Sequence, residues 1–227
     1  MSPLSSSPPQ PRAAVHPIEQ ESFAILRRRV DLSHLAPLTR AVVERVVHAS
    51  ADLSYVDDLV ADEQSLRRGQ EALVGGAPVV ADVEMVAAGI TSRRAVCRVR
   101  EARACDGLTR SAAAVRLAYE QVGPGAVWVV GCAPTALFEI LDLGVQPALV
   151  VGLPVGFVGA AESKLALRQS GLPAVSNTSE KGGSAVAAAA LNALLYEAAA
   201  PEHPPRHGTS SPPDPPDPPD PLPEESP

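Results

Sequence analysis

The sequence has few cysteines, few aromatic side chains and no long apolar run. Its 227 residues are 3% aromatic and contain three cysteines, an odd number without CxxC spacing, so neither a disulfide framework nor a zinc site is indicated. No run of eighteen apolar residues occurs, and residues 1–15 lack a hydrophobic core, which argues against a membrane span and a secretory signal. The net charge of −7 argues against a general nucleic-acid binder, whose affinity would rest on a basic surface. We therefore expect a cytoplasmic protein with neither nucleic-acid nor membrane partners.

The common phosphate-binding and hydrolytic motifs are also missing. Gly152, Gly156 and Gly159 do not form GxGxxG, and GxxxxGK[ST], GxSxG and HExxH are absent. A nucleotide cofactor is therefore not supported, and we expect neither a cofactor nor metal ligands. If the protein binds an anion, this pattern favours a carboxylate.

The distribution of proline divides the chain into a core and two tails. Residues 201–227 hold 12 of the 24 prolines, and six acidic residues there face the single basic residue Arg206. Such a segment cannot bury enough apolar surface to fold, so disorder is predicted for it and for the Ser/Pro-rich residues 1–15. A proline-rich ligand for a partner domain is an alternative for either tail. Residues 16–200 are predicted to form one domain.

Apolar runs alternate with helical patterns through this core. The predicted strands are 78–83, 126–130, 147–152 and 172–176. The predicted helices are 18–30, 36–49, 62–74, 109–122, 136–143, 160–170 and 183–199. Repetition of strand, turn and helix implies right-handed βαβ units. We predict an α/β fold, doubly wound, with a mainly parallel sheet and helices on both faces.

Three glycine-rich junctions follow the predicted strands, at 131–135, 152–164 and 177–184. In an open parallel sheet, ligands bind beyond the carboxyl ends of the strands, and N–H groups at helix starts favour anions. Both lysines of the chain, Lys164 and Lys181, fall in these junctions, and Arg110 opens a predicted helix. We expect substrate carboxylates to bind there, although tight turns and helix caps would produce the same pattern.

His48 lies in the last turn of the predicted helix 36–49, off its apolar stripe. A helix C-terminus stabilises imidazolium, so His48 could donate a proton near neutral pH. A plain helix-end histidine is the alternative interpretation. His16, which precedes Pro17, is expected to cap the first helix.

A series of short motifs occurs in order along residues 16–200. They are His16-Pro-Ile-Glu19, Ser22-Phe23, Val46-Val-His-Ala49, Gly76-Ala-Pro78, Glu84-Met-Val-Ala-Ala-Gly-Ile-Thr91, Thr109-Arg-Ser-Ala-Ala-Ala114, Ala133-Pro-Thr-Ala-Leu-Phe138, Pro154-Val-Gly-Phe-Val-Gly-Ala-Ala-Glu-Ser-Lys164 and Lys181-Gly-Gly-Ser184. This order resembles the precorrin-8X methylmutase family of corrin biosynthesis, and the stretch 157–164 is its most specific part. Two departures are Cys132, where the family usually has Asn, and Ser50-Ala51, where a glycine-containing turn is typical.

The resemblance implies an isomerase of cobalamin biosynthesis that moves a methyl group from carbon 11 to carbon 12 on ring C. Its product would be hydrogenobyrinate from precorrin-8X, or cobyrinate from the cobalt-containing precursor. It also implies a homodimer of α/β fold that needs no cofactor and holds its corrinoid substrate in a cleft near the subunit interface. His48 matches the family's catalytic histidine, expected to protonate a ring nitrogen. The residues expected to contact the substrate are Ser22, Thr91, Arg110, Ser111, Thr135, Lys164, Gly182, Gly183 and Ser184.

Two other functions are alternatives to a methylmutase. A carrier that binds a corrinoid without converting it would show a bound coloured ligand and no isomerisation. An unrelated doubly wound enzyme that uses a nucleotide would respond to nucleotide titration. Whether the substrate contains cobalt stays open at this point.

Overall fold

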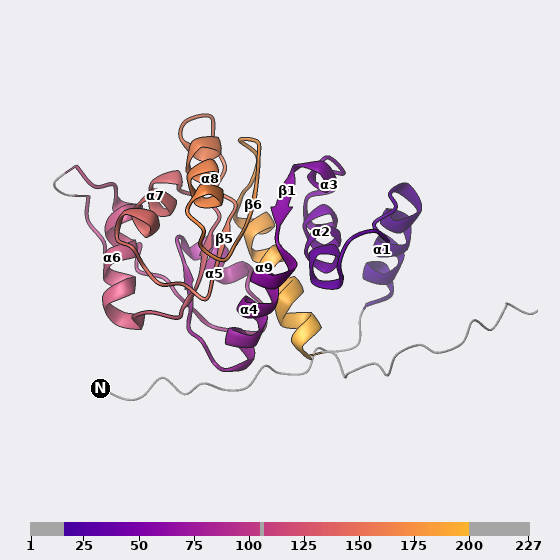
Figure 1. Cartoon of the computed structure of the whole chain (residues 1–227), viewed down its shortest axis with the longest axis horizontal. Coiled ribbons are helices and arrows are strands. Elements are labelled where there is room, and N and C mark those ends of the chain that lie inside the picture. Colours follow the sequence, from indigo (N-terminus) through magenta and orange to yellow (C-terminus); the bar gives the residue numbers. More distant parts are fainter. Residues whose placement is uncertain (1–15, 105–106, 200–227) are drawn as a thin grey trace, which may run out of the picture.

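A six-stranded sheet forms the centre of the protein in a computed structural model that describes residues 16–104 and 107–199 (Figure 1). The strands are β1 Leu59–Ala61, β2 Val79–Ala81, β3 Ala95–Val96, β4 Val127–Val130, β5 Leu149–Gly152 and β6 Ala174–Asn177. Their order across the sheet is β1-β6-β5-β4-β2-β3. Only β1 runs antiparallel to its neighbour, so the prediction of a mainly parallel sheet is confirmed. The disorder predicted for 1–15 and 201–227 concerns segments outside the described residues.

Helices cover both faces of this sheet. They are α1 Pro17–Arg29, α2 Pro37–Ser50, α3 Tyr55–Asp58, α4 Glu63–Val74, α5 Glu84–Gly89, α6 Arg110–Val122, α7 Pro134–Asp142, α8 Ala160–Gln169 and α9 Ser184–Ala199. The buried side chains of α2, α4, α5 and α9 share one apolar core, and those of α6, α7 and α8 share a second core on the opposite face. Figure 1 shows α1 beside α2 at one end of the molecule, with α6 and α7 at the other. The doubly wound architecture is therefore confirmed.

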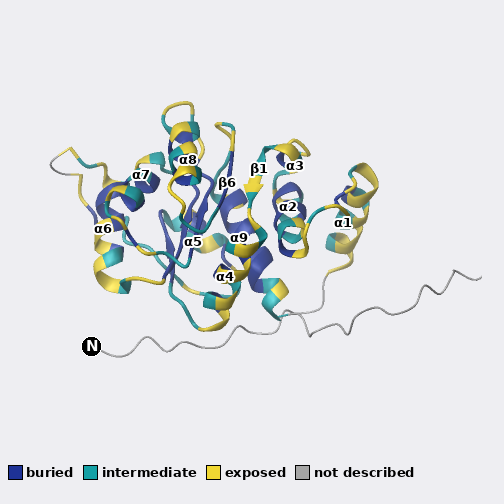
Figure 2. Cartoon of the chain, in the orientation of Figure 1, coloured by how far each residue is buried: buried dark blue, intermediate teal, exposed yellow. Residues whose placement is uncertain are grey.

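The two cores form because successive side chains of a buried strand point to opposite faces of the sheet. In β4, Val127 and Val129 face the core shared with α9, whereas Trp128 and Val130 face the opposite core. Helix α9 is buried along most of its length, because it packs against α2, α4, α5 and the sheet at once (Figure 2). An Ala/Leu sequence without a polar face suits that position.

Helix boundaries follow the expected capping chemistry. His16 caps α1, because its Nδ1 accepts the N–H of Ile18 at 3.2 Å, which confirms the prediction for this histidine. Helix α2 is followed by Ala51 as its C-cap, whose φ of +54° is left-handed. Glycine is favoured at such a helix end, so this alanine occupies a position where a side chain costs free energy.

Four short elements differ from the predictions, and several predicted boundaries shift by one or two residues. Helices α3 and α5 and the edge strands β1 and β3 were not predicted, and the strand expected at 78–83 is limited to Val79–Ala81. Elements of two to six residues contain too few positions to display a period. Their pairing with neighbours fixes them instead, as in the antiparallel alignment of β1 with β6. In the described part of the chain, no helix has the length and apolar character needed to cross a membrane.

Candidate active site

The segments that follow the strands gather at the carboxyl edge of the sheet. Parallel strands bring together the residues after β2, β4, β5 and β6, together with the start of α9. The end of α2 reaches the same edge, because Lys181 Nζ, after β6, lies 2.7 Å from Asp52 Oδ2, just beyond α2. His48, in the last turn of α2, is therefore placed near this edge.

Two consecutive residues of α1 hold the His48 ring. Ser22 Oγ and His48 Nδ1 share a hydrogen bond at 2.8 Å. The Phe23 ring stacks on the imidazole, with 4.7 Å between ring centroids and an interplanar angle of 17°. The ring is half-buried and is fixed both in its plane and at one of its nitrogens. These two contacts fix the direction in which the ring points, which a proton donor requires.

Arg45 lies one turn before His48 and ties three helices together. Its guanidinium pairs with the Glu19 carboxylate of α1. It also lies 4.9 Å from the ring centroids of both Phe23 and Tyr196, which belong to α1 and α9. Sequence reasoning did not select Arg45, although its spacing of three residues from His48 places it on the same helix face.

Thr91 joins this group through α9. Its hydroxyl shares a hydrogen bond with the Tyr196 hydroxyl, and its N–H donates to Asn192 Oδ1 at 3.2 Å. Ser22 and His48 are connected to Thr91 through the rings and guanidinium of Phe23, Arg45 and Tyr196. The structure therefore brings three predicted site residues, Ser22, His48 and Thr91, into one continuous group.

The predicted residues Arg110, Ser111 and Thr135 form a second group at the starts of α6 and α7. Thr109 caps α6 by accepting the Ala112 N–H at 3.2 Å, and its hydroxyl lies 2.7 Å from that of Thr135. Arg110 is the first residue of α6, which confirms that it opens a helix, and it is exposed. These helices cover the face of the sheet opposite to α2.

The N–H groups of residues 131–133 are not offered to a substrate, which corrects the sequence-based expectation for this part of the junction 131–135. The buried carboxylate of Asp82 accepts the N–H groups of Gly131, Cys132 and Ala133 at 3.1, 2.8 and 2.9 Å. Strand order reverses between β2 and β4, where ligands often bind, but here the protein's own carboxylate fills that position. Burial raises the pKa of Asp82, although these hydrogen bonds oppose the rise.

Lys164 also differs from its predicted role as a substrate contact. Its side chain is fully buried, and Nζ donates to Asn177 Oδ1 at 2.9 Å and to the carbonyl oxygens of Ser179 and Lys181. Burial lowers the pKa of Lys164 to about 8. All three ammonium protons thus face acceptors at the end of β6 and in the loop that follows it, so this lysine supports that loop and does not reach a ligand.

Gly182, Gly183 and Ser184 connect this loop to α9. Gly182 has a φ of +154°, and a Cβ there would lie 2.6 Å from the Pro154 carbonyl oxygen. The N–H of Gly183 donates to Leu153 O at 2.9 Å. Only glycine permits this close approach to the segment after β5, so the start of α9 is held in one position.

Residues that could hold a metal ion do not gather anywhere in 16–104 or 107–199 as three or more His, Cys, Asp or Glu side chains. The predicted site residues thus fall into three groups: the His48 ring held by α1, the hydroxyls and Arg110 at the starts of α6 and α7, and the glycine-rich segment before α9.

Comparison with known proteins connects this arrangement to one family. The family model described as Precorrin-8X methylmutase matches residues 17–197. A precorrin-8X methylmutase from Pseudomonas aeruginosa is 42% identical over 197 residues, covering 79% of this chain and 94% of that protein. A cobalt-precorrin-8 methylmutase from Salmonella typhimurium is 40% identical over 196 residues, covering 79% and 93%. The crystal structure of a precorrin-8x methyl mutase from Thermus thermophilus superposes with a TM-score of 0.72 at 34% identity, covering 80% of this chain and 95% of that one.

Proposed function

Because this chain belongs to the precorrin-8X methylmutase family, we propose that it is an isomerase of cobalamin biosynthesis that moves a methyl group from carbon 11 to carbon 12 of ring C of a corrinoid precursor. The relatives named above are methylmutases, so the carrier alternative has no support from them. The observation that carries the proposal is the His48 ring, held by Ser22 at one nitrogen and by Phe23 across its face.

In this proposal, His48 is the general acid. A methyl shift around a macrocycle requires polarisation of the π-system, and protonation of a ring nitrogen supplies it. Nδ1 stays with Ser22, so the proton leaves from Nε2 and returns there once the methyl group has moved. The isomerisation therefore consumes no proton. General acid catalysis of this kind contributes about 10²–10⁴-fold to the rate.

The remaining residues would bind and orient the substrate. The corrinoid carries acetate and propionate arms, and arginine pairs with carboxylates in a bidentate manner, so Arg110 is the proposed anchor. The hydroxyls of Thr91, Ser111 and Thr135, and the segment 182–184, supply further contacts. Binding at several points of the periphery fixes ring C relative to His48, and such orientation lowers the barrier without further chemistry.

We also propose that the protein is a homodimer in the cytoplasm. Side chains in the loop before α8 support an interface with a second copy, because Phe157 and Val158 are 94% and 89% exposed. Two adjacent apolar side chains in such positions are stabilised when a partner covers them. Light scattering at micromolar concentration should give the mass of a dimer, and an active monomer would contradict this part of the proposal.

The activity is tested by incubating the purified protein with metal-free precorrin-8X and, separately, with its cobalt form. We expect the absorption spectrum of at least one of them to change to that of the isomerised product, hydrogenobyrinate or cobyrinate. The faster reaction identifies the preferred substrate. A bound corrinoid whose spectrum keeps the substrate form in both incubations would contradict the proposal and favour a carrier.

A further inference from the structure

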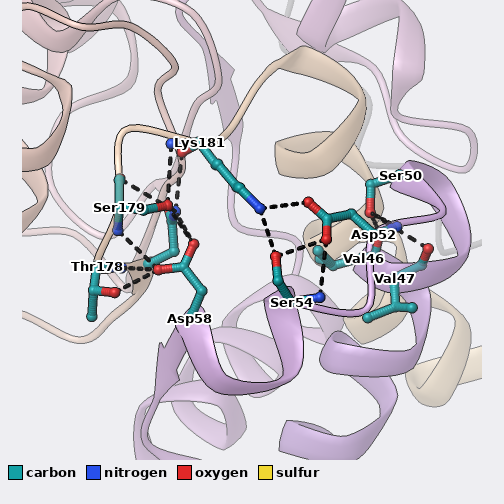
Figure 3. Close-up of polar contacts among 10 residues, drawn as sticks. Val46, Val47, Ser50, Asp52, Ser54, Asp58, Thr178, Ser179 and Lys181 are labelled. Atoms are coloured by element: carbon teal, nitrogen blue, oxygen red, sulfur yellow. Dashed lines mark hydrogen bonds and ion pairs between the residues drawn. The ribbon is translucent and has the colours of Figure 1, made fainter. Parts of the chain in front are cut away.

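The loop between β6 and α9 is organised by one carboxylate from α3. Asp58 Oδ1 accepts the N–H groups of Thr178 and Ser179 at 2.9 and 2.8 Å, together with the Thr178 hydroxyl. Its Oδ2 accepts the Ser179 hydroxyl at 2.6 Å (Figure 3). The same oxygen accepts the Asn177 amide at 2.8 Å. Both oxygens thus accept hydrogen bonds from the last residue of β6 and the first two residues of the loop.

Asp58 remains ionised in this setting. Burial alone would raise its pKa, but the hydrogen bonds from Ser179, Thr178 and Asn177 outweigh burial and leave the pKa well below the ordinary value. From the other side, the buried ammonium of Lys164 binds carbonyl oxygens of the same loop. The carboxylate takes the loop's N–H and hydroxyl donors, and the ammonium takes its acceptors. The loop therefore has few alternative conformations.

A second connection ties the loop to the helix that carries His48. Lys181 Nζ lies 2.7 Å from Asp52 Oδ2 and 2.6 Å from Ser54 Oγ. The N–H of Asp52 in turn donates to Ser50 Oγ at 3.2 Å, and Ser50 is the last residue of α2 (Figure 3). Asp52 is ionised near neutral pH, since the Lys181 hydrogen bond lowers its pKa to about 2.

The chain passes directly from Lys181 to Gly182, Gly183 and Ser184, the segment proposed to meet the substrate. We propose that Asp58 is a positioning residue for the methylmutase reaction, fixing loop 177–183 so that this segment receives the corrinoid at a set distance from His48. This inference rests on the proposed function. It assigns a role in substrate binding to a side chain that lies outside the motifs of the sequence.

Asp58→Ala tests the inference, and Asp62→Ala is its matched control. Asp62 is also a carboxylate at a helix end near α3, where it caps α4 by accepting the Ser65 N–H at 2.8 Å, and no described contact joins it to loop 177–183. Both variants lose a carboxylate with local hydrogen bonds. Three quantities are compared with wild type: kcat, KM for the corrinoid, and Kd for the isomerised product by titration. Thermal unfolding is recorded in parallel.

We expect Asp58→Ala to raise KM and the product Kd by about tenfold or more, with kcat at saturation within about threefold of wild type. Asp62→Ala should keep all three within about twofold. Asp58→Asn keeps an acceptor for the N–H groups of Thr178 and Ser179 and should restore part of the affinity. If Asp58→Ala does not unfold cooperatively, Asp58→Asn replaces it in the comparison. In that case KM and the product Kd of Asp58→Asn must each rise at least threefold over wild type, with kcat within about threefold.

Equal KM and Kd values for the Asp58 and Asp62 variants would overturn the inference, even if both were less stable. A fall in kcat at unchanged KM would also overturn it. Failure of the proposed function is a separate result, since it would appear as absence of turnover in the wild-type protein. An active wild type with an unaffected Asp58 variant refutes the positioning role alone.

Discussion

Replacing Ser22 with alanine removes the hydrogen bond that the structure shows at His48 Nδ1. A hydrogen bond to a charged group contributes about 1.5–3 kcal/mol. His48 is half-buried, so water can replace part of this interaction, and the lower end of the range applies. A loss of about 1.4 kcal/mol corresponds to a tenfold fall in kcat. KM should change little, because the hydroxyl contacts the catalytic ring and not the corrinoid.

The assay is the initial rate of product formation by absorption, measured from below KM to saturation. Ser22→Thr serves as the control, because it keeps a hydroxyl at the same position and should recover most of the rate. If Ser22→Ala kept kcat within twofold of wild type, the hydrogen bond would have no part in proton transfer. A rise in KM at constant kcat would instead show that Ser22 contacts the substrate, as the sequence alone suggested.

Three further predictions concern binding and stability. Arg110→Ala should weaken corrinoid binding by about 1.5–3 kcal/mol, the contribution of a charge-assisted pair, with saturated turnover unchanged; an affinity within threefold of wild type by equilibrium titration would contradict this. The depressed pKa of Asp58 contributes stability above its unfolded value of about 3.9, and this stability is lost as pH falls towards the folded value. The difference in unfolding free energy between wild type and Asp58→Asn should therefore be constant above about pH 5 and shrink below about pH 4 in urea titrations, and a difference independent of pH would refute the assignment. Ala51→Gly should stabilise the protein by about 0.5–1 kcal/mol. An L-residue in the left-handed region costs about 1–2 kcal/mol, and the greater backbone entropy that glycine loses on folding offsets part of this difference. A lower urea midpoint for Ala51→Gly would argue against strain at this position.

The long buried strands and the capped helices could be predicted from the sequence because their signals are local. The apolar run at 126–130 predicted β4, and His16 before Pro17 predicted the cap of α1. The last-turn position of His48 and the motif around it selected the residue that the structure shows clamped by α1. Short elements such as β3, with two residues, depend on pairing with distant strands and give no such signal.

The supporting contacts of the site could not be predicted, because they join residues far apart in the sequence. Asp58 meets Ser179 across 121 residues of sequence, and Asp82 meets Gly131 across 49. For Lys164, the sequence predicted a role in substrate binding that the structure does not support. A lysine in a glycine-rich junction resembles a ligand-binding residue, yet complete burial and three protein acceptors give it a structural role. Burial and partner geometry, and not residue type, decide between the two roles.

The central claim is that His48 supplies the proton for the methyl shift, and the turnover of His48→Ala at saturating corrinoid tests it most directly. The account predicts a fall in kcat of about 10²-fold or more with the Kd for the corrinoid nearly unchanged, because binding comes from the carboxylate contacts at the periphery. Turnover of His48→Ala within a few-fold of wild type would contradict the account and leave orientation of the substrate as the only source of catalysis.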